Sequence, residues 1–234
     1  DLVNTVKLWN GTGYTTYNTA SPQPTPFNRF CSADLAAPTA YYNSVTQLGT
    51  QDRIFMNGEE GGEGRAIAHI ATGAEAGIAY ELPALGKFSW ENSVASPIEG
   101  NKTVVGGMDD GNGGQVYFYV GTKTNTGSVI DKAGLTNGKL FGVAVADLKM
   151  ETSAGVPTAK TAFTLKDLGD VKALSLTQLN DNSVAADVTT FLRPEDGAWD
   201  PKSPNDFYFA TTNSITSPSR LWKLAFTDAS NPEL

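Results

Sequence analysis

Short apolar runs separated by Gly, Asn and Asp turns fill the chain from residue 52 onward, and this pattern constrains the fold more than any other feature. Runs of this length between turn residues are typical of β-strands. Residues 116–120 (VYFYV) have the β-branched and aromatic enrichment expected of a strand buried on both faces. Residues 174–179 fit either a helical turn or a strand. We predict strands over residues 53–57, 65–71, 77–82, 87–91, 103–107, 115–121, 140–146, 207–212 and 221–226.

Acidic turns recur at the ends of the expected strands. The most charged stretch runs from Arg193 to Pro201 and includes Glu195 and Asp196. Carboxylates packed this densely beside strands are costly unless cations, arginines or water satisfy them. The remaining acidic turns are Gly58-Glu59-Glu60-Gly61, Trp90-Glu91-Asn92 and Met108-Asp109-Asp110-Gly111. Four such turns suggest one shared metal centre.

The acidic turns also help to choose among the all-β architectures, which are a barrel, a sandwich and a propeller. A propeller brings loops that are distant in sequence to one axial channel, whereas a sandwich spreads them along an edge. We therefore predict an all-β fold, a β-propeller with irregular blades over residues 51–234. No repeat of ~40 residues is visible, so a WD40 propeller is not expected. Residues 1–50 are polar and weakly periodic, and we expect an irregular N-terminal arm packed on the domain.

The composition of the chain excludes some classes of binding partner. Lys and Arg number 17 against 25 Asp and Glu, a formal net charge of −8, which argues against a nucleic-acid partner. No apolar run reaches the length of a membrane-spanning helix. The chain begins with Asp1 and is rich in Gly, Pro, Asn and Thr, and we expect an extracellular or periplasmic protein. The single cysteine, Cys31, cannot form an intramolecular disulfide.

The reactive side chains of this sequence favour metal binding through oxygen atoms over other kinds of site. His69 is the only histidine, which excludes two-histidine zinc sites and facial triads within this chain. No nucleophile elbow, Walker A loop or dinucleotide-binding motif is present. Hard cations such as Ca²⁺ take carboxylate and carbonyl oxygens, which Gly-rich acidic turns supply. Arg65 and Arg193 lie beside acidic turns, where they either pair with the carboxylates or clamp an anionic ligand.

An ordered series of short motifs resembles the PhoX-type alkaline phosphatase family, including its secreted relatives. The motifs are Leu48-Gly49-Thr50, Asn57-Gly58-Glu59-Glu60, Leu85-Gly86-Lys87-Phe88-Ser89-Trp90-Glu91, Met108-Asp109-Asp110 and Arg193-Pro194-Glu195-Asp196-Gly197. They occur in this order over residues 28–226. The resemblance implies a β-propeller with an axial, carboxylate-rich site that holds calcium and iron and hydrolyses phosphomonoesters outside the cytoplasm.

Carried onto this sequence, the resemblance implies a specific set of ligands. Glu59 or Glu60, Glu91 and Glu195 would bind metal, with Asp109 and Asp110 close by. The acidic stretch adds Asp196 to the expected metal ligands. Arg193 and Glu195 would act at the reacting phosphate, and Arg65 or Arg193 would stabilise its equatorial oxygens.

Two departures from the family pattern change these expectations. Family phosphatases place an iron-binding cysteine directly before the paired glutamates, and here that position is Gly58. Fe³⁺ is therefore doubtful, whereas Ca²⁺ is expected. Cys31 in the N-terminal arm is an alternative source of a thiol, but it is not placed among the expected ligands. Family members also continue for further blades beyond the point where this chain stops. We expect an incomplete ring, completed by a second chain or by residues beyond Leu234.

Two classes of function remain. The first is an exported calcium-binding propeller that hydrolyses a phosphate ester, or that binds another small anion. The second is a non-catalytic secreted or surface protein whose acidic turns hold calcium for stability or assembly. A calcium-dependent lactonase or ester hydrolase is a further alternative, because propellers host several hydrolytic chemistries.

Overall fold

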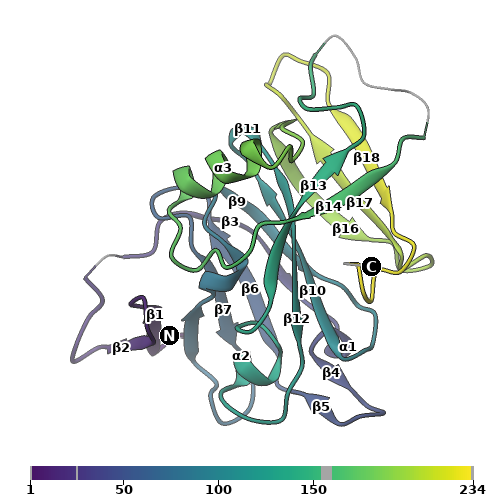
Figure 1. Ribbon diagram of the computed structural model, residues 1–234. Coiled ribbons are helices and arrows are strands. Elements are labelled where there is room, and N and C mark those ends of the chain that lie inside the picture. The colour runs from purple at the N-terminus through teal and green to yellow at the C-terminus, as the bar shows by residue number, and fades with distance from the viewer. Residues whose placement is uncertain (1, 25, 154–159, 233–234) are drawn as a thin grey trace.

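The computed structural model describes residues 2–24, 26–153 and 160–232, and these residues form an all-β structure (Figure 1). The first sheet has six strands in the order β2-β1-β8-β7-β6-β3. All its neighbours are antiparallel except β1 and β8, which are parallel. The strands are β1 (Thr5–Trp9), β2 (Tyr14–Asn18), β3 (Phe30–Leu35), β6 (Ile54–Glu59), β7 (Ala66–Ile70) and β8 (Ile78–Glu81).

Two further antiparallel sheets follow in the chain. A five-stranded sheet has the order β14-β13-β12-β10-β9, and a three-stranded sheet has the order β16-β17-β18. The five strands are β9 (Trp90–Ala95), β10 (Lys102–Asp109), β12 (Val116–Thr122), β13 (Lys139–Val145) and β14 (Phe163–Asp167). The three are β16 (Pro194–Trp199), β17 (Asp206–Thr211) and β18 (Arg220–Ala225).

The remaining elements are short. Two-stranded pairs join β4 (Tyr42–Asn43) to β5 (Leu48–Gly49), and β11 (Asn112–Gly114) to β15 (Phe191–Leu192). The helices are α1 (Pro38–Tyr41), α2 (Val129–Lys132) and α3 (Leu176–Ala185), with a 3₁₀ turn at Pro83–Leu85. Capping boxes start α2 at Ser128 and α3 at Ser175, so the first backbone amides of both helices are satisfied. Across the described part of the chain, no helix is long and apolar enough to cross a membrane.

The three large sheets each place one edge strand against a neighbouring sheet. β3 and β16 both contact β9, so the edge strands β3, β9 and β16 lie side by side. From these edges the strands follow outward as antiparallel meanders, with β3 leading to β6 and β7, β9 to β10 and β12, and β16 to β17 and β18. No sheet formed by the described residues closes on itself. The three edge strands gather residues that are distant in the sequence.

The five-stranded sheet is buried on both faces. Tyr117 belongs to the apolar core shared with the first sheet, whereas its neighbour Phe118 belongs to the core shared with the three-stranded sheet. Phe118 makes edge-on contacts with Trp199 and Phe207 across that second core. Successive side chains of a strand point to opposite faces, so this alternation follows from the strand period. The predicted burial of residues 116–120 on both faces is confirmed.

Residues 174–179 fitted a helical turn or a strand, and the structure shows the helical alternative, with residues 176–179 in α3 behind a capping box at Ser175. Most predicted strands are present, and two differences have physical causes. The strand expected at 87–91 begins only at Trp90, because Phe88 and Ser89 lie in the irregular segment that enters β9. Residues 1–50, expected to be irregular, contribute β1, β2 and β3, since sheet pairing satisfies their backbone groups. The division of the chain at residue 50 stays a prediction.

Candidate metal centre

Two groups of metal-ligating side chains lie where β3, β9 and β16 meet. Cys31, Glu60 and Glu91 form one group, and Glu91, Asp110 and Glu195 form the other. Within each group, one ligand atom from every residue lies within 4.8 Å of the others. Glu91 belongs to both groups, so they are two adjacent parts of one cluster.

A β-bulge in each edge strand brings these side chains together. In β3 and β16, two residues oppose a single residue of the neighbouring strand, and in β9 one residue is left without a pairing partner. A bulge of this kind re-aims side chains and is frequent next to active sites. The bulges consist of Cys31 and Ser32 in β3, Glu91 in β9, and Glu195 and Asp196 in β16.

The group that contains the thiol is built from β3 and from the turn after β6. The Sγ atom of Cys31 lies 3.3 Å from Oε1 of Glu91. Glu60 is held by an ion pair with Arg29, and its backbone amide donates to the carbonyl of Arg29. The second carboxylate oxygen of Glu60, Oε2, is buried and has no hydrogen-bond partner among the residues that the structure describes. A buried carboxylate oxygen without a donor indicates that a cation or water belongs there.

The oxygen-only group is organised by Arg193. Its guanidinium donates two hydrogen bonds of 2.9 Å to the two carboxylate oxygens of Asp110 and lies 3.1 Å from Glu195. Thr212 donates a further hydrogen bond of 2.6 Å to Glu195. Arg193 itself has a φ of 58°, a left-handed conformation that is uncommon outside glycine. The strained residue therefore sits beside the cluster, where backbone strain is most often found.

The electrostatics of the cluster favour a bound cation. Burial raises the pKa of Glu91, and the nearby carboxylates of Glu195, Asp110 and Glu60 raise it further. Burial also raises the pKa of Asp110, as does Glu195, although the hydrogen bond from Arg193 opposes the shift. Carboxylates crowded this closely repel one another in their charged forms. A divalent cation would relieve that repulsion, so the residues fit a metal site.

Three predicted metal ligands lie outside both groups. Glu59 is fully buried and forms an ion pair of 2.6 Å with Arg65, whose side chain is also buried. Asp109 accepts hydrogen bonds of 3.1 Å from the backbone amides of Ser89 and Gly111. The carboxylate of Asp196 faces Asn92 and Ser32 on the other side of the bulges. The structure therefore brings together four of the predicted ligands, Glu60, Glu91, Asp110 and Glu195.

Cys31 is the member of the cluster that the sequence reasoning left out. Its bulge places it opposite Gly58, the position where the family pattern expects a cysteine. A Cβ atom on Gly58 would lie 2.3 Å from Cβ and Cγ of Trp90, so this position has no room for a side chain. The thiol reaches the cluster from the neighbouring strand instead. The pairing of β3 with β6 would have identified Cys31, but residues 28–35 carry no clear strand signal.

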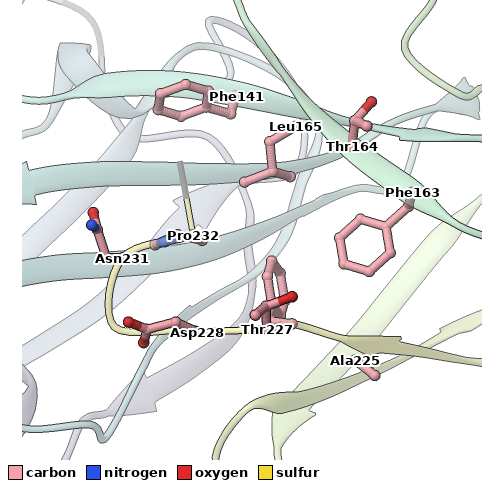
Figure 2. A pocket seen from close by; sticks show the side chains of 10 residues that line it. Phe141, Phe163, Thr164, Leu165, Ala225, Thr227, Asp228, Asn231 and Pro232 are labelled. Carbon is pink, nitrogen blue, oxygen red and sulfur yellow. The ribbon is translucent and has the colours of Figure 1, made fainter. Parts of the chain in front are cut away.

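Two other features lie apart from these residues. His69 on β7 pairs with Asn57 through a contact of 3.0 Å and packs edge-on against Phe30, as expected for a structural histidine. A pocket of about 460 Å³ lies between β14 and the segment that follows β18 (Figure 2). Its walls include Phe163 and Leu165, and Asp228, the only carboxylate among the described residues that line it, accepts hydrogen bonds from Ser230. This pocket shares no residue with the metal-ligating cluster.

Comparison with solved structures shows the fold of this chain, and no comparison shows its family. No protein-family model and no curated protein matches the sequence. The structure is similar to Pseudomonas fluorescens PhoX, solved in complex with vanadate, a transition-state analogue. The match has a TM-score of 0.53 at 15% sequence identity and covers 86% of this chain and 47% of the PhoX chain. The chain thus spans about half the length of that structure, and it has a PhoX-like fold.

Proposed function

We propose that this chain is a metal-dependent hydrolase of phosphomonoesters whose cations are held by the cluster at β3, β9 and β16. The observation that carries the proposal is the pair of ligand groups that share Glu91. Two adjacent cations are a recurrent solution for phosphoryl transfer, because they neutralise the phosphate and orient both its attacking and its leaving oxygens. The PhoX-like fold supports the choice of a phosphate ester, since PhoX itself binds vanadate.

The donor atoms of the two groups differ, and so do the cations we assign to them. Glu91, Asp110 and Glu195 offer oxygen atoms only, the donor set that Ca²⁺ prefers. Cys31, Glu60 and Glu91 add a thiol, which favours a softer transition metal. The thiol returns iron to consideration, because it supplies the sulfur ligand that Gly58 cannot carry. We propose calcium in the first group and leave the second to a borderline or thiophilic metal.

The chain's own residues would bind and position the phosphate. Arg193 is one-third exposed and is already oriented by Asp110, so its guanidinium is placed to meet an anionic oxygen beside the cluster. Glu195 lies between Arg193 and the shared ligand Glu91 and would hold the cation while limiting the movement of Arg193. Arg65 forms a buried ion pair with Glu59, and we propose that it stabilises the loop that carries Glu60. Bound cations would supply the charge that turns this acidic site into one that accepts phosphate.

The propeller architecture and export are parts of the same proposal. Three meanders that start at adjacent edge strands are the arrangement expected of neighbouring blades around an axis, and the PhoX-like fold supports it. A ring of this kind would need further blades, from a second chain or from more of the same chain. We also propose an extracellular or periplasmic location, where calcium is plentiful.

Hydrolysis of p-nitrophenyl phosphate, with and without Ca²⁺ and Fe³⁺, tests the enzymatic proposal. We expect turnover that depends on metal and that falls at least a hundredfold in Glu91→Gln, because this substitution removes a ligand from both groups. Asp187→Asn is the matched control, since Asp187 is an exposed carboxylate paired with Lys149 outside the cluster. Absence of turnover with every metal would refute the enzymatic proposal.

Chelation separates this proposal from a purely structural calcium site. With EDTA, the melting temperature should fall in the wild type, because a cation that binds only the folded state stabilises it. A fall in melting temperature without any hydrolysis would favour the non-catalytic alternative. If the melting temperature is unchanged and elemental analysis finds no calcium in the purified protein, both the metal-dependent hydrolase and the structural calcium site would be refuted.

A further inference from the structure

Two consecutive threonines lie where β17 ends, and each hydroxyl donates a hydrogen bond to a carboxylate. Thr211 is buried and donates to Glu151 at 2.9 Å. Thr212 is half-buried and donates to Glu195 at 2.6 Å. Glu151 is fully buried and paired with Arg220, so the first contact stabilises the interior of the fold. Glu195 belongs to the metal-ligating cluster, so the second contact bears on cation binding.

The hydrogen bond from Thr212 fixes one particular oxygen of Glu195. A distance of 2.6 Å between a hydroxyl and a carboxylate is typical of a strong, charge-assisted bond. Its acceptor is Oε1, and the guanidinium of Arg193 lies 3.1 Å from the same oxygen. Neither contact uses Oε2. The carboxylate is therefore oriented through one oxygen by two groups, a hydroxyl and a guanidinium.

The backbone of the same segment holds Arg193 in its left-handed conformation. The amide of Thr212 donates to the carbonyl of Arg193 at 3.2 Å, and the next amide, of Asn213, donates to the carbonyl of Leu192 at 2.9 Å. Asn213 is also left-handed, with a φ of 53°. Such strain persists only where the surrounding structure holds it. Thr212 therefore contacts Arg193 through its amide and Glu195 through its hydroxyl.

We propose that Thr212 is a positioning residue, whose hydroxyl holds Oε1 of Glu195 so that Oε2 binds the cation of the oxygen-only group. The inference rests on the proposed function, which assigns calcium to that group. Without the hydroxyl, Glu195 can rotate and pair with Arg193 through both oxygens, because a guanidinium binds a carboxylate through two parallel hydrogen bonds. That pairing withdraws Glu195 from the cation. The hydroxyl thus keeps one oxygen for the arginine and the other for the metal.

Calorimetric titration with Ca²⁺ tests the role of the hydroxyl. Thr212→Val removes the hydroxyl with little change of shape and keeps the backbone amide that holds Arg193. We expect its Ca²⁺ affinity to fall about tenfold, as when a hydrogen bond to a metal ligand is removed. Thr212→Ser keeps a hydroxyl and should restore most of that affinity. Thr16→Val is the matched control, because Thr16 is exposed on β2, at the edge of the first sheet opposite β3.

Two further measurements separate a positioning role from a structural one. At saturating Ca²⁺ the kcat of Thr212→Val should return to that of the wild type, because the residue acts only through cation binding. A lower melting temperature of Thr212→Val in EDTA, without a change in Ca²⁺ affinity, would identify a structural role and overturn the inference.

The same titration distinguishes failure of this inference from failure of the proposed function. Equal Ca²⁺ affinity in the wild type and in Thr212→Val would overturn the positioning role, and retained hydrolysis would leave the proposed function standing. A tenfold loss of affinity in Thr212→Val, with no phosphatase activity in the wild type, would support the positioning role and refute the proposed function. Absence of Ca²⁺ binding to the wild type would overturn both the inference and the assignment of calcium.

Discussion

Replacement of Arg65 by Met should destabilise the protein strongly, because it leaves the buried carboxylate of Glu59 without its cationic partner. In the wild type this carboxylate accepts hydrogen bonds from Nε of Arg65 at 2.8 Å and from Nη2 at 2.6 Å. Two backbone amides, of Asn28 and of Arg65 itself, donate at 2.7 and 3.1 Å. The side chain of Glu59 is fully buried, so water cannot replace the lost guanidinium.

Proton binding limits the electrostatic part of the cost. A buried carboxylate that has lost its cationic partner can become neutral, and protonating a group of ordinary pKa 4.5 at pH 7 costs about 3 kcal/mol. The two backbone donors that remain reduce this cost, and the loss of the guanidinium's packing adds to it. We expect a loss of about 3 kcal/mol in the free energy of unfolding at pH 7, or about 6–12 °C in melting temperature.

The pH dependence identifies the mechanism. Burial raises the pKa of Glu59, but the hydrogen bonds from Arg65 and from the backbone amides outweigh it, so the net pKa is lowered. In the wild type this group therefore stabilises the fold above its ordinary pKa, and that contribution is lost as the pH falls. In Arg65→Met the folded state holds a proton that the unfolded state lacks, so the cost of the substitution should shrink by about 1.4 kcal/mol per unit as the pH falls from 7 toward 5.

Urea unfolding in EDTA between pH 5 and 8 measures both quantities. Lys149→Met is the matched control, because its ion pair with Asp187 is exposed and should contribute little to stability. Glu59→Gln/Arg65→Met should recover stability at pH 7 relative to Arg65→Met and should lose the pH dependence. The reasoning would be refuted if Arg65→Met lost less than about 1 kcal/mol and its unfolding free energy changed with pH as that of the wild type does.

Three other substitutions test separate parts of the structure. Gly58→Ala should cost about 1–3 kcal/mol, because the new Cβ meets Trp90, whereas Gly100→Ala meets nothing and should have little effect on thermal unfolding. Glu151→Ala should cost about 3–5 kcal/mol in urea, since this buried carboxylate pairs with Arg220 and accepts a hydrogen bond from Thr211. Ser175→Ala should cost about 1 kcal/mol through loss of the α3 cap, and Ser175→Asp, which keeps an acceptor, should restore it.

The sequence predicted the fold class well where local signals and burial agree. Residues 116–120 combine β-branched and aromatic side chains with burial on both faces, so composition and environment indicate the same element. The arm was harder to predict. β2 (Tyr14–Asn18) has no buried residue, and it is a strand because it pairs along the edge of β1. Pairing of this kind depends on the neighbouring strand and leaves little trace in the segment itself.

The candidate site was predicted in part for a similar reason. Glu60, Glu91, Asp110 and Glu195 lie in the acidic turns that the sequence makes conspicuous, and all four join the cluster. Glu59 and Asp109 occur in the same turns but have other partners. Glu59 is the last residue of β6 and pairs with Arg65, whereas Glu60 lies in the turn that follows. The carboxylate of Asp109 accepts hydrogen bonds from the backbone amides of Ser89 and Gly111. Adjacent acidic residues in one turn therefore have different roles that only the pairing register assigns.

The bulges explain how the three edge strands deliver their ligands to one place. In a regular strand, consecutive side chains point to opposite faces. The pairing register shifts at Cys31 in β3, at Glu91 in β9 and at Glu195 in β16, and each of these residues belongs to the metal-ligating cluster. Because a bulge re-aims the side chains beside it, the cluster depends on all three irregularities. A change of register in any one of the three strands should therefore weaken cation binding even when every ligand residue is retained.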